Sequence, residues 1–258
     1  MKITIKKSVA INDAETWHFV APPKDPEKQW KNGRSAKELA RFATDPFFTE
    51  FIKKLLDKES ITPQDFECEP EAETRFEKEG DDEIIDLGKG GPRNHDLLMI
   101  GSDDCVFGVE AKVSEKFGNH TVKQEWNSSK SSKNKKEKRI PGLIKFLSNN
   151  QDADYESSTD NIKDLQYQLL TATVGTILEA KRRKKDKAIV LVLIFEGNVA
   201  KEDGYKKKIE DNKKAFNAFC NVFFKNKETE IQGIKCRIIE RAVIIKSNYD
   251  SLYSFEMI

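Results

Sequence analysis

The sequence predicts an α/β fold in which a mixed central β-sheet is flanked by helices. Three segments carry this prediction. Ala188–Phe195 is apolar throughout, as expected for a strand inside a sheet that helices cover on both faces. Asp96–Val113 contains two strand-like runs around a short turn, and Asp160–Arg183 has apolar side chains at helical spacing. A chain of 258 residues fits a single domain of this class, residues 1–258.

The N-terminal third predicts a strand followed by two helices. The first ten residues alternate as in a strand. Ser35 is expected to be the N-cap of a helix over AKELARFA, with Glu38 three residues later as in a capping box. Pro46 interrupts this helix, and FFTEFIKKLL resumes the helical pattern. The acid-rich Thr62–Lys78 favours no element, and Asp82–Leu87 suits a short strand.

The next segment predicts a β-hairpin. Leu97–Ile100 is apolar, GSDD is turn-forming, and Cys105–Val113 is rich in strand-forming residues. Residues whose numbers sum to about 206 then lie opposite each other, so Asp96 faces Glu110 with about 5 Å between Cβ atoms. Strand periodicity places Lys112 on the same face as Glu110.

The second half predicts a loop, two helices and further strands. Asn127–Lys138 contains no apolar residue, so we expect a mobile loop there. Order should return near Arg139, and Asp160–Arg183 predicts one long helix. After the apolar strand, Lys206–Lys225 predicts a helix and Gly233–Ser247 one or two strands.

Composition excludes several classes of protein. The 45 basic and 44 acidic residues nearly cancel, so no global field draws the protein to nucleic acid or to an anionic membrane, and such a surface must be local. The longest apolar run is too short to span a bilayer, and MKITIKK lacks the apolar stretch of a signal peptide, so we expect a cytoplasmic protein with no membrane partner. The four cysteines form no CxxC pair and are expected as reduced core thiols, and the three histidines show no zinc-site spacing.

The hairpin also carries the candidate chemistry. An acid-x-Lys pattern occurs at Glu110–Lys112, but also by chance at Glu179–Lys181 and Asp211–Lys213. Only the first ends an apolar strand opposite another acid, Asp96. Two carboxylates that close repel each other unless a cation lies between them, and a hard divalent ion with oxygen ligands is the usual resolution. From the residues alone, an active site and a surface ion pair on an ordinary hairpin both remain open.

The order of elements and motifs resembles the PD-(D/E)XK nuclease superfamily, which has a restriction-endonuclease-like core. That core runs helix, strand, Asp-bearing strand, strand ending in Glu-x-Lys, and helix. More narrowly, Trp30–Ala40, Val109–Gly118, Val122–Trp126 and Leu165–Arg182 together look like an uncharacterised prokaryotic branch of it. The resemblance covers about residues 30–195, which leaves N-terminal and C-terminal additions. His95-Asp96 replaces the usual Pro-Asp, and the role of His95 stays open.

The resemblance implies roles residue by residue. Asp96, Glu110 and the backbone carbonyl of Ala111 would bind Mg²⁺, for which Mn²⁺ can substitute. Lys112 would orient or activate the attacking water and stabilise charge on the phosphate. Gln168 matches a glutamine that many members place beside the active site. Glu38 matches a first-helix glutamate that some members use to bind a water on the metal, and its alternative is the capping role.

The implied activity is Mg²⁺-dependent hydrolysis of phosphodiester bonds by a nuclease, with DNA favoured as the substrate and RNA not excluded. Restriction, phage defence and repair all remain open as pathways, and many members cut as homodimers. The basic segments Lys181–Lys187 and Lys130–Lys138 either grip phosphates or are solvated surface. The rival hypothesis is a catalytically inert nuclease-derived module that binds nucleic acid or a protein partner. Binding of Mg²⁺ or Mn²⁺ that raises the melting temperature would discriminate between the two.

Overall fold

The structure is a computed structural model of the 258-residue chain. It describes residues 1–76, 87, 91–113, 115–131, 138–150, 155–156, 160–197, 204–224 and 228–245. Most of the strand predicted at Asp82–Leu87 lies outside these residues.

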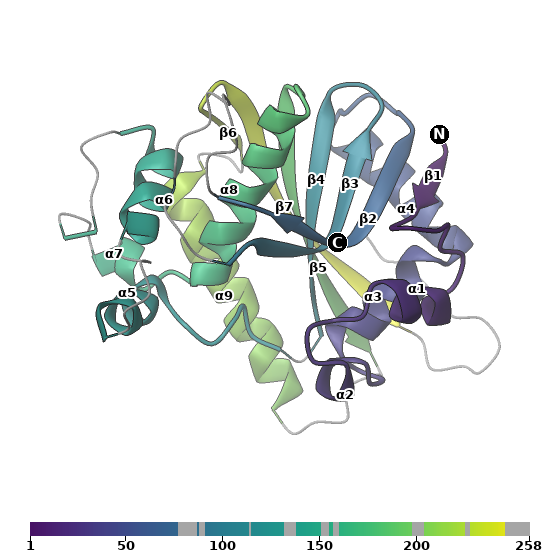
Figure 1. The fold of residues 1–258 in the computed structure, drawn as a ribbon, viewed down its shortest axis with the longest axis horizontal. Helices are drawn as coiled ribbons and strands as arrows, with labels where there is room; N and C mark the ends of the chain where they lie inside the picture. Colours follow the sequence, from purple (N-terminus) through teal and green to yellow (C-terminus); the bar gives the residue numbers. More distant parts are fainter. Residues whose placement is uncertain are drawn as a thin grey trace.

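Runs of helices and runs of strands follow one another along the chain, and the strands are gathered in one sheet (Figure 1). The strands are β1 (Ile3–Ile5), β2 (Phe66–Thr74), β3 (Arg93–Gly101), β4 (Cys105–Lys112), β5 (Lys187–Gly197), β6 (Glu228–Ile231) and β7 (Ile234–Ile245). The helices before β3 are α1 (Ala14–Val20), α2 (Pro26–Gln29), α3 (Ser35–Ala43) and α4 (Pro46–Lys58). The later helices are α5 (Val122–Ser131), α6 (Arg139–Ser148), α7 (Asp160–Lys163), α8 (Tyr167–Arg182) and α9 (Tyr205–Phe223).

The sheet is mixed, which confirms the predicted α/β class. Its strand order is β1-β2-β3-β4-β5-β7-β6. Strands β2, β3 and β4 are antiparallel neighbours, whereas β4, β5 and β7 run parallel. Strand β4 therefore has an antiparallel neighbour, β3, on one side and a parallel neighbour, β5, on the other, and every one of its residues is buried.

Two hydrophobic layers cover the two faces of the sheet. One layer packs α1, α3 and α4 against residues such as Val109 and Leu191. The other packs α5, α6, α8 and α9 against residues such as Val106 and Val190. Figure 1 shows the N-terminal helices in purple on one side and α5, α6, α8 and α9 on the other. The alternation of Val106 and Val109 between layers follows from the period of two along a strand.

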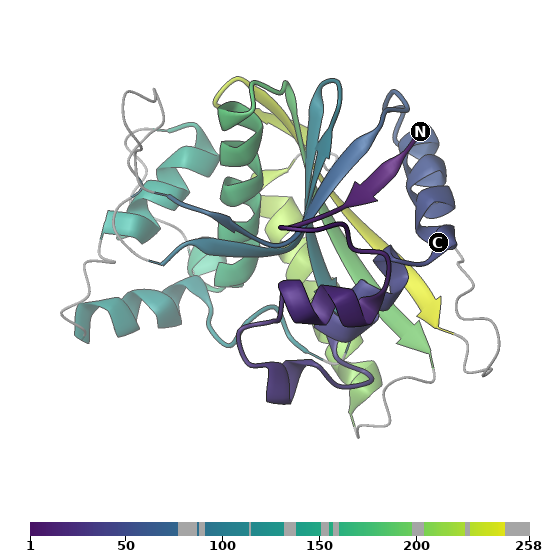
Figure 2. The same cartoon turned by 45° about the vertical axis from the view of Figure 1, so that its right-hand side comes forward.

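Strands β2 and β3 bend together across α8. In β3, Leu97 and Met99 belong to the layer with α3 and α4, and Leu98 faces the other layer. His95 also contacts α8. It lies an odd number of residues from Leu98, and two such side chains in a regular strand would face opposite layers. The regular alternation of side chains is therefore interrupted between them. Glu71, between the ladder partners of Leu97 and His95, has a φ of 47°. The bent blue strands are visible in both views (Figure 1 and Figure 2).

The predicted capping box at Ser35 is wrong. Helix α3 begins at Ser35 itself, Arg34 is the N-cap, and no side chain caps this end. The backbone N–H of Ser35 donates instead to Glu115 at 3.1 Å. Glu38 accepts from the backbone N–H of Gly33 at 2.8 Å. The tertiary contact with Glu115 satisfies the donor that a capping box would have satisfied.

One boundary in the second half also differs from prediction. Asn127–Ser131 is helical as the end of α5, because a helix anchored by the buried Val122 and Trp126 continues into the polar stretch. Residues 132–137 of the predicted loop lie outside the described part of the chain, and α6 begins at Arg139 as expected.

The predicted long helix over Asp160–Arg183 is two helices, α7 and α8. Residues 164–166 between them turn aside to pair with the start of α5. The carbonyl of Leu165 accepts from the N–H of Val122 at 2.8 Å, and the N–H of Tyr167 donates to His120 at 3.1 Å. These contacts replace intrahelical hydrogen bonds.

The predicted helix near Lys206–Lys225 and the strands near Gly233–Ser247 are present as α9, β6 and β7. Among the helices that the structure describes, none is both long and apolar enough to cross a membrane. All four cysteines are buried free thiols, as predicted.

Candidate active site

The hairpin of β3 and β4 has the predicted register. Its ladder pairs Leu97 with Val109 and Ile100 with Val106, pairs whose numbers sum to 206. The ladder ends at Leu97–Val109, one residue before Asp96 and Glu110. Asp96 is therefore at the bend of β3, where the two strands begin to separate.

Glu110 is the centre of a buried polar cluster. Its side chain is 1% exposed. Oε1 accepts hydrogen bonds from Lys112 Nζ and from Gln168 Nε2, each at 2.5 Å. Oε2 forms an ion pair with Arg93. Three donors from β3, β4 and α8 thus converge on one carboxylate.

The side chain of Asp96 contacts β4 beyond the end of the backbone ladder. Its Oδ2 accepts a hydrogen bond from the backbone N–H of Ala111 at 2.7 Å, so this carboxylate lies beside the peptide group between Glu110 and Ala111. The sequence-predicted residues Asp96, Glu110, Ala111, Lys112 and Gln168 are therefore brought together.

Gln168 comes from the first turn of α8, which lies close against β4. A Cβ atom added at Gly108 would be 2.0 Å from Thr176 Oγ1, so only glycine permits this approach of helix and strand. The Gln168 amide oxygen is buried without a hydrogen-bond partner among the described residues. An unpaired buried acceptor at a polar site needs a donor or a cation.

Burial and like charges perturb the carboxyl groups of the site. Burial and the neighbouring Glu110 raise the pKa of Asp96 to about 6. Burial also acts on Glu110, but Arg93 and Lys112 hold its pKa below the usual value. Burial acts against the charge of Lys112, yet Glu110 and Asp96 raise its pKa above the usual value. Lys112 is therefore an ammonium in this arrangement.

Sequence reasoning missed two members of the site, Arg93 and Glu71. Arg93 reaches Glu110 from the start of β3, beyond the bend. Glu71 is placed opposite Asp96 by the β2–β3 register, and burial together with Asp96 raises its pKa to about 8. The strict alternation of glutamates in FECEPEAET could have identified β2, but no sequence signal indicates the bend that brings Glu71 and Arg93 to the site.

The cluster opens into a cleft of about 850 Å³. Asp96, Lys112, Gln168, Glu71 and Arg93 all line it. Its outer walls add basic side chains from the segment around α2 and the start of α3, and from the chain after β4: Lys24, Lys28, Lys31, Arg34 and Lys116. A chain with nearly balanced charge thus has a locally basic cleft around an acidic centre.

Three carboxylates, Asp96, Glu110 and Glu71, lie together at the site. Burial and their mutual repulsion raise the pKa of Asp96 and of Glu71, although the cationic side chains of Arg93, Lys112 and Lys7 act in the opposite direction. A hard cation would relieve this repulsion. Within the described residues, no group of three or more His, Cys, Asp or Glu side chains is arranged to hold a metal ion. Asp96, Glu110 and the Ala111 carbonyl could still bind one, but Arg93 and Lys112 now hold both oxygens of Glu110.

His95 is a packing residue here. It is 1% exposed, its Nε2 lies 3.1 Å from Thr74 Oγ1, and its ring meets Gly108 and Gly175. Burial lowers the pKa of His95 to about 3, so the ring is neutral and not a charged partner of the site.

Glu38 and the basic end of α8 do not line the cleft. Glu38 is buried and pairs with Arg41 Nη1 at 3.3 Å. Lys185 Nζ donates to the carbonyl of Asp103 at 2.7 Å, beside the β3–β4 turn and at the other end of α8 from Gln168. For Lys185, this contact favours a role in the fold over a phosphate contact.

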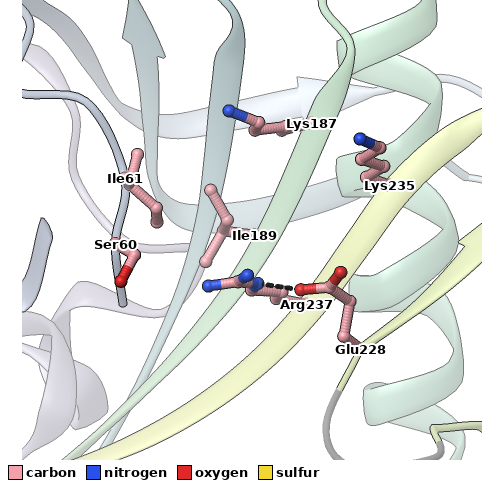
Figure 3. Close-up of a pocket in the computed structure, with 7 residues that line it drawn as sticks. All are labelled: Ser60, Ile61, Lys187, Ile189, Glu228, Lys235 and Arg237. Atoms are coloured by element: carbon pink, nitrogen blue, oxygen red, sulfur yellow. Dashed lines mark hydrogen bonds and ion pairs between the residues drawn. The ribbon is translucent and has the colours of Figure 1, made fainter. Parts of the chain in front are cut away.

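A second hollow, of about 150 Å³, lies at the N-terminal ends of β5 and β7 (Figure 3). Lys187, Lys235 and Arg237 line it. Arg237 pairs with Glu228, and Lys187 Nζ lies 2.5 Å from Asp104 Oδ2. Ligands of parallel sheets bind at the carboxyl ends of the strands, where Glu110 and Lys112 lie, and this hollow is at the opposite end.

Comparison with known proteins gives one match. A model of a family described as a domain of unknown function (DUF6946) matches residues 10–242. No curated protein and no solved structure matches the chain.

Proposed function

The chain belongs to the DUF6946 family of domains of unknown function, and we propose that it is a metal-dependent nuclease that hydrolyses phosphodiester bonds, with DNA as the favoured substrate. One observation carries the proposal. Two carboxylates, an ammonium and a glutamine amide, from β3, β4 and α8, converge at Glu110 in a cleft whose walls are basic.

The order of elements supports the same reading. Helices α3 and α4, strand β2, the Asp96 strand β3, the Glu110–Lys112 strand β4 and helix α8 follow the order of the PD-(D/E)XK core. Glu110 and Lys112 lie at the carboxyl end of β4, beyond its antiparallel pairing with β3 and within its parallel pairing with β5.

The residues divide the chemistry among themselves. Mg²⁺ held by Asp96 and Glu110 would supply an acidified water and charge neutralisation at the phosphate. Lys112, being an ammonium, cannot accept a proton, so it orients the water and stabilises negative charge on the phosphate as the bond breaks. The basic side chains of the outer wall neutralise the phosphates on either side.

A specific observation keeps the inert binding module as a second candidate. Arg93 and Lys112 together neutralise Glu110, so the cluster is balanced at that carboxylate without a metal. A module that only binds nucleic acid or protein would need nothing more. The four buried thiols fit a reducing compartment, and we place the protein in the cytoplasm as part of this proposal.

The test is cleavage of labelled single-stranded and duplex DNA and RNA, with Mg²⁺, with Mn²⁺ and with chelator. Wild type should cut at least one substrate only with metal, and Lys112→Ala should not. Lys181→Ala is the matched control, because Lys181 ends the same acid-Ala-Lys pattern away from the cleft. Wild-type protein that binds no Mn²⁺ by calorimetry and cuts nothing would support the inert module.

A further inference from the structure

A smaller pocket of about 270 Å³ adjoins the catalytic cleft. The two share Pro92, Arg93 and Asn94. The remaining described residues that line it are Phe76, Gly91, Arg139, Tyr167 and Thr171. It therefore carries two guanidinium groups and no acidic side chain among its described lining residues, whereas the catalytic cleft next to it holds both signs of charge.

Arg139 is the unusual residue of this pocket. It is 5% exposed, and its Nη1 donates to the carbonyl of Gly91 at 2.9 Å. The guanidinium also lies near the Tyr167 hydroxyl and acts to lower the pKa of that group. Nε and Nη2 are buried without a partner among the described residues. The guanidinium is fixed over the ring of Phe76, 4.9 Å from its centroid. Two buried guanidinium nitrogens without acceptors lower the stability of the fold, unless a ligand or water accepts hydrogen bonds from them.

Arg93 connects the pocket to the catalytic centre. Its Nη2 pairs with Glu110, while its Nε is buried without a partner in the described part of the chain. An anion that contacts Arg93 in the pocket would thus be linked to the Glu110 carboxylate through this one side chain. Arg139 and Tyr167 are also the first residues of α6 and α8, so two helix N-termini add partial positive charge.

We propose that this pocket binds a second phosphate of the nucleic-acid strand, beside the one that is cut, through Arg139 and Arg93. The planar fork of an arginine matches the oxygens of a phosphate, and the described residues that line the pocket include no carboxylate that would repel one. The Thr171 hydroxyl, which now donates to the carbonyl of Gln168 at 3.0 Å, lines the same wall and adds a polar contact. The assignment of the anion to a nucleic-acid strand rests on the proposed nuclease function.

The first test needs no cleavage. Thermal unfolding is followed in sodium phosphate and in sodium chloride of equal ionic strength, for wild type, Arg139→Gln, Thr171→Val and Arg241→Gln. Arg241 is the matched control, since it is 7% exposed, also has an unpaired Nε, and pairs with Glu59 away from the pocket. Phosphate should raise the melting temperature of wild type and of Arg241→Gln, but not that of Arg139→Gln. An equal rise in Arg139→Gln, or none in wild type, would overturn the proposal and leave those donors to water.

The second test locates the phosphate on the strand. Single methylphosphonates, which remove one phosphate charge, are placed at each position around the cleaved bond. We expect wild type to lose about 10- to 100-fold in kcat/KM at one neighbouring position, as for a charged hydrogen bond. Arg139→Gln should lose nothing further there. Thr171→Val, which keeps the volume of the side chain, should bind phosphate about 2- to 10-fold more weakly, as for a neutral hydrogen bond.

Comparison of 5′-phosphorylated and 5′-hydroxyl strands distinguishes an internal from a terminal phosphate. An Arg139-dependent preference for the phosphorylated end with a flat methylphosphonate scan would assign the pocket to a strand terminus, against an internal neighbour. If phosphate stabilises the protein through Arg139 and no strand is ever cut, the pocket stands and the nuclease proposal fails. If strands are cut and neither scan depends on Arg139, the nuclease stands and the second phosphate site fails.

Discussion

Replacement of Arg93 by methionine should tighten the binding of Mn²⁺. Arg93 pairs with Oε2 of Glu110, and Lys112 and Gln168 occupy Oε1, so a metal ion must displace one of these groups to reach the carboxylate. Methionine keeps an unbranched side chain of comparable length but removes the charge and the donors. Glu110 then has one oxygen free and keeps Lys112 as its cationic partner.

The size of the effect follows from the contact that is lost. The Arg93 side chain is 12% exposed and that of Glu110 is 1% exposed, so solvent screens the pair little. A hydrogen bond to a charged group contributes about 1.5–3 kcal/mol. A metal ion that no longer competes with it gains that amount, which corresponds to about 10- to 100-fold in Kd.

The assay is calorimetric titration of Mn²⁺ well above the Asp96 pKa of about 6, with unfolding measured in parallel. Without metal, Arg93→Met should melt lower than wild type, because a buried carboxylate loses its partner. Saturating Mn²⁺ should raise its melting temperature more than that of wild type.

Arg41→Met is the matched control. Arg41 pairs with Glu38, which is as buried as Glu110 but lies outside the cleft. This variant should lose stability without any change in Mn²⁺ affinity. An unchanged or weaker affinity in Arg93→Met would refute the idea that Arg93 competes with a cation for Glu110.

Three further predictions address charge, turnover and packing. The folded-state pKa of Asp96 is raised from 3.8 to about 6, so its contribution to stability is complete below the lower value and declines as pH rises through the higher one. Asp96→Asn should remove that decline, so above pH 6 in chelator its free energy of unfolding should exceed that of wild type by on the order of 1–3 kcal/mol. A difference between the two proteins that does not depend on pH in denaturant unfolding would contradict this. Lys112→Ala should retain or tighten Mn²⁺ binding while single-turnover cleavage falls at least about 100-fold, and cleavage at the full rate would make the lysine an ordinary ion-pair partner. Gly108→Ala should lower the free energy of unfolding by about 1–3 kcal/mol, because its Cβ would meet Thr176 at 2.0 Å. Gly91→Ala is the control, because a Cβ there would have no atom within 4 Å. Equal stability of both variants would show that α8 shifts freely.

Local patterns were sufficient for most of the fold and for the centre of the site. The hairpin register followed from turn chemistry and from strand periodicity, and it brought Asp96 to Glu110 and Lys112. Helix α8 was visible from its apolar spacing, whereas Gln168 was indicated by the resemblance to the nuclease superfamily. The hairpin and the helix depend on residues near each other in the chain.

The parts that sequence reasoning missed depend on contacts between distant segments. Helices α7 and α8 separate because Leu165 bonds to the start of α5. Ser35 loses its capping role to Glu115, which lies 80 residues away. Arg93 and Glu71 reach the cleft only because β2 and β3 bend, and a bend in two paired strands leaves no periodic signal in either one.

That bend places polar side chains of the cleft outside the two hydrophobic layers. At Glu71 and Asp96 the alternation of side chains between the two layers is interrupted in both strands. These two residues belong to neither hydrophobic layer. Polar side chains thus line the cleft at the bend, while each core keeps its own apolar residues. Substitutions at Glu71 and Asp96 can therefore change the charge of the cleft without changing an apolar residue of either core. A single-residue insertion in either strand would shift Glu71 relative to Asp96 and would also turn the apolar side chains beyond it toward the opposite layer, so it should disrupt the site and the packing together.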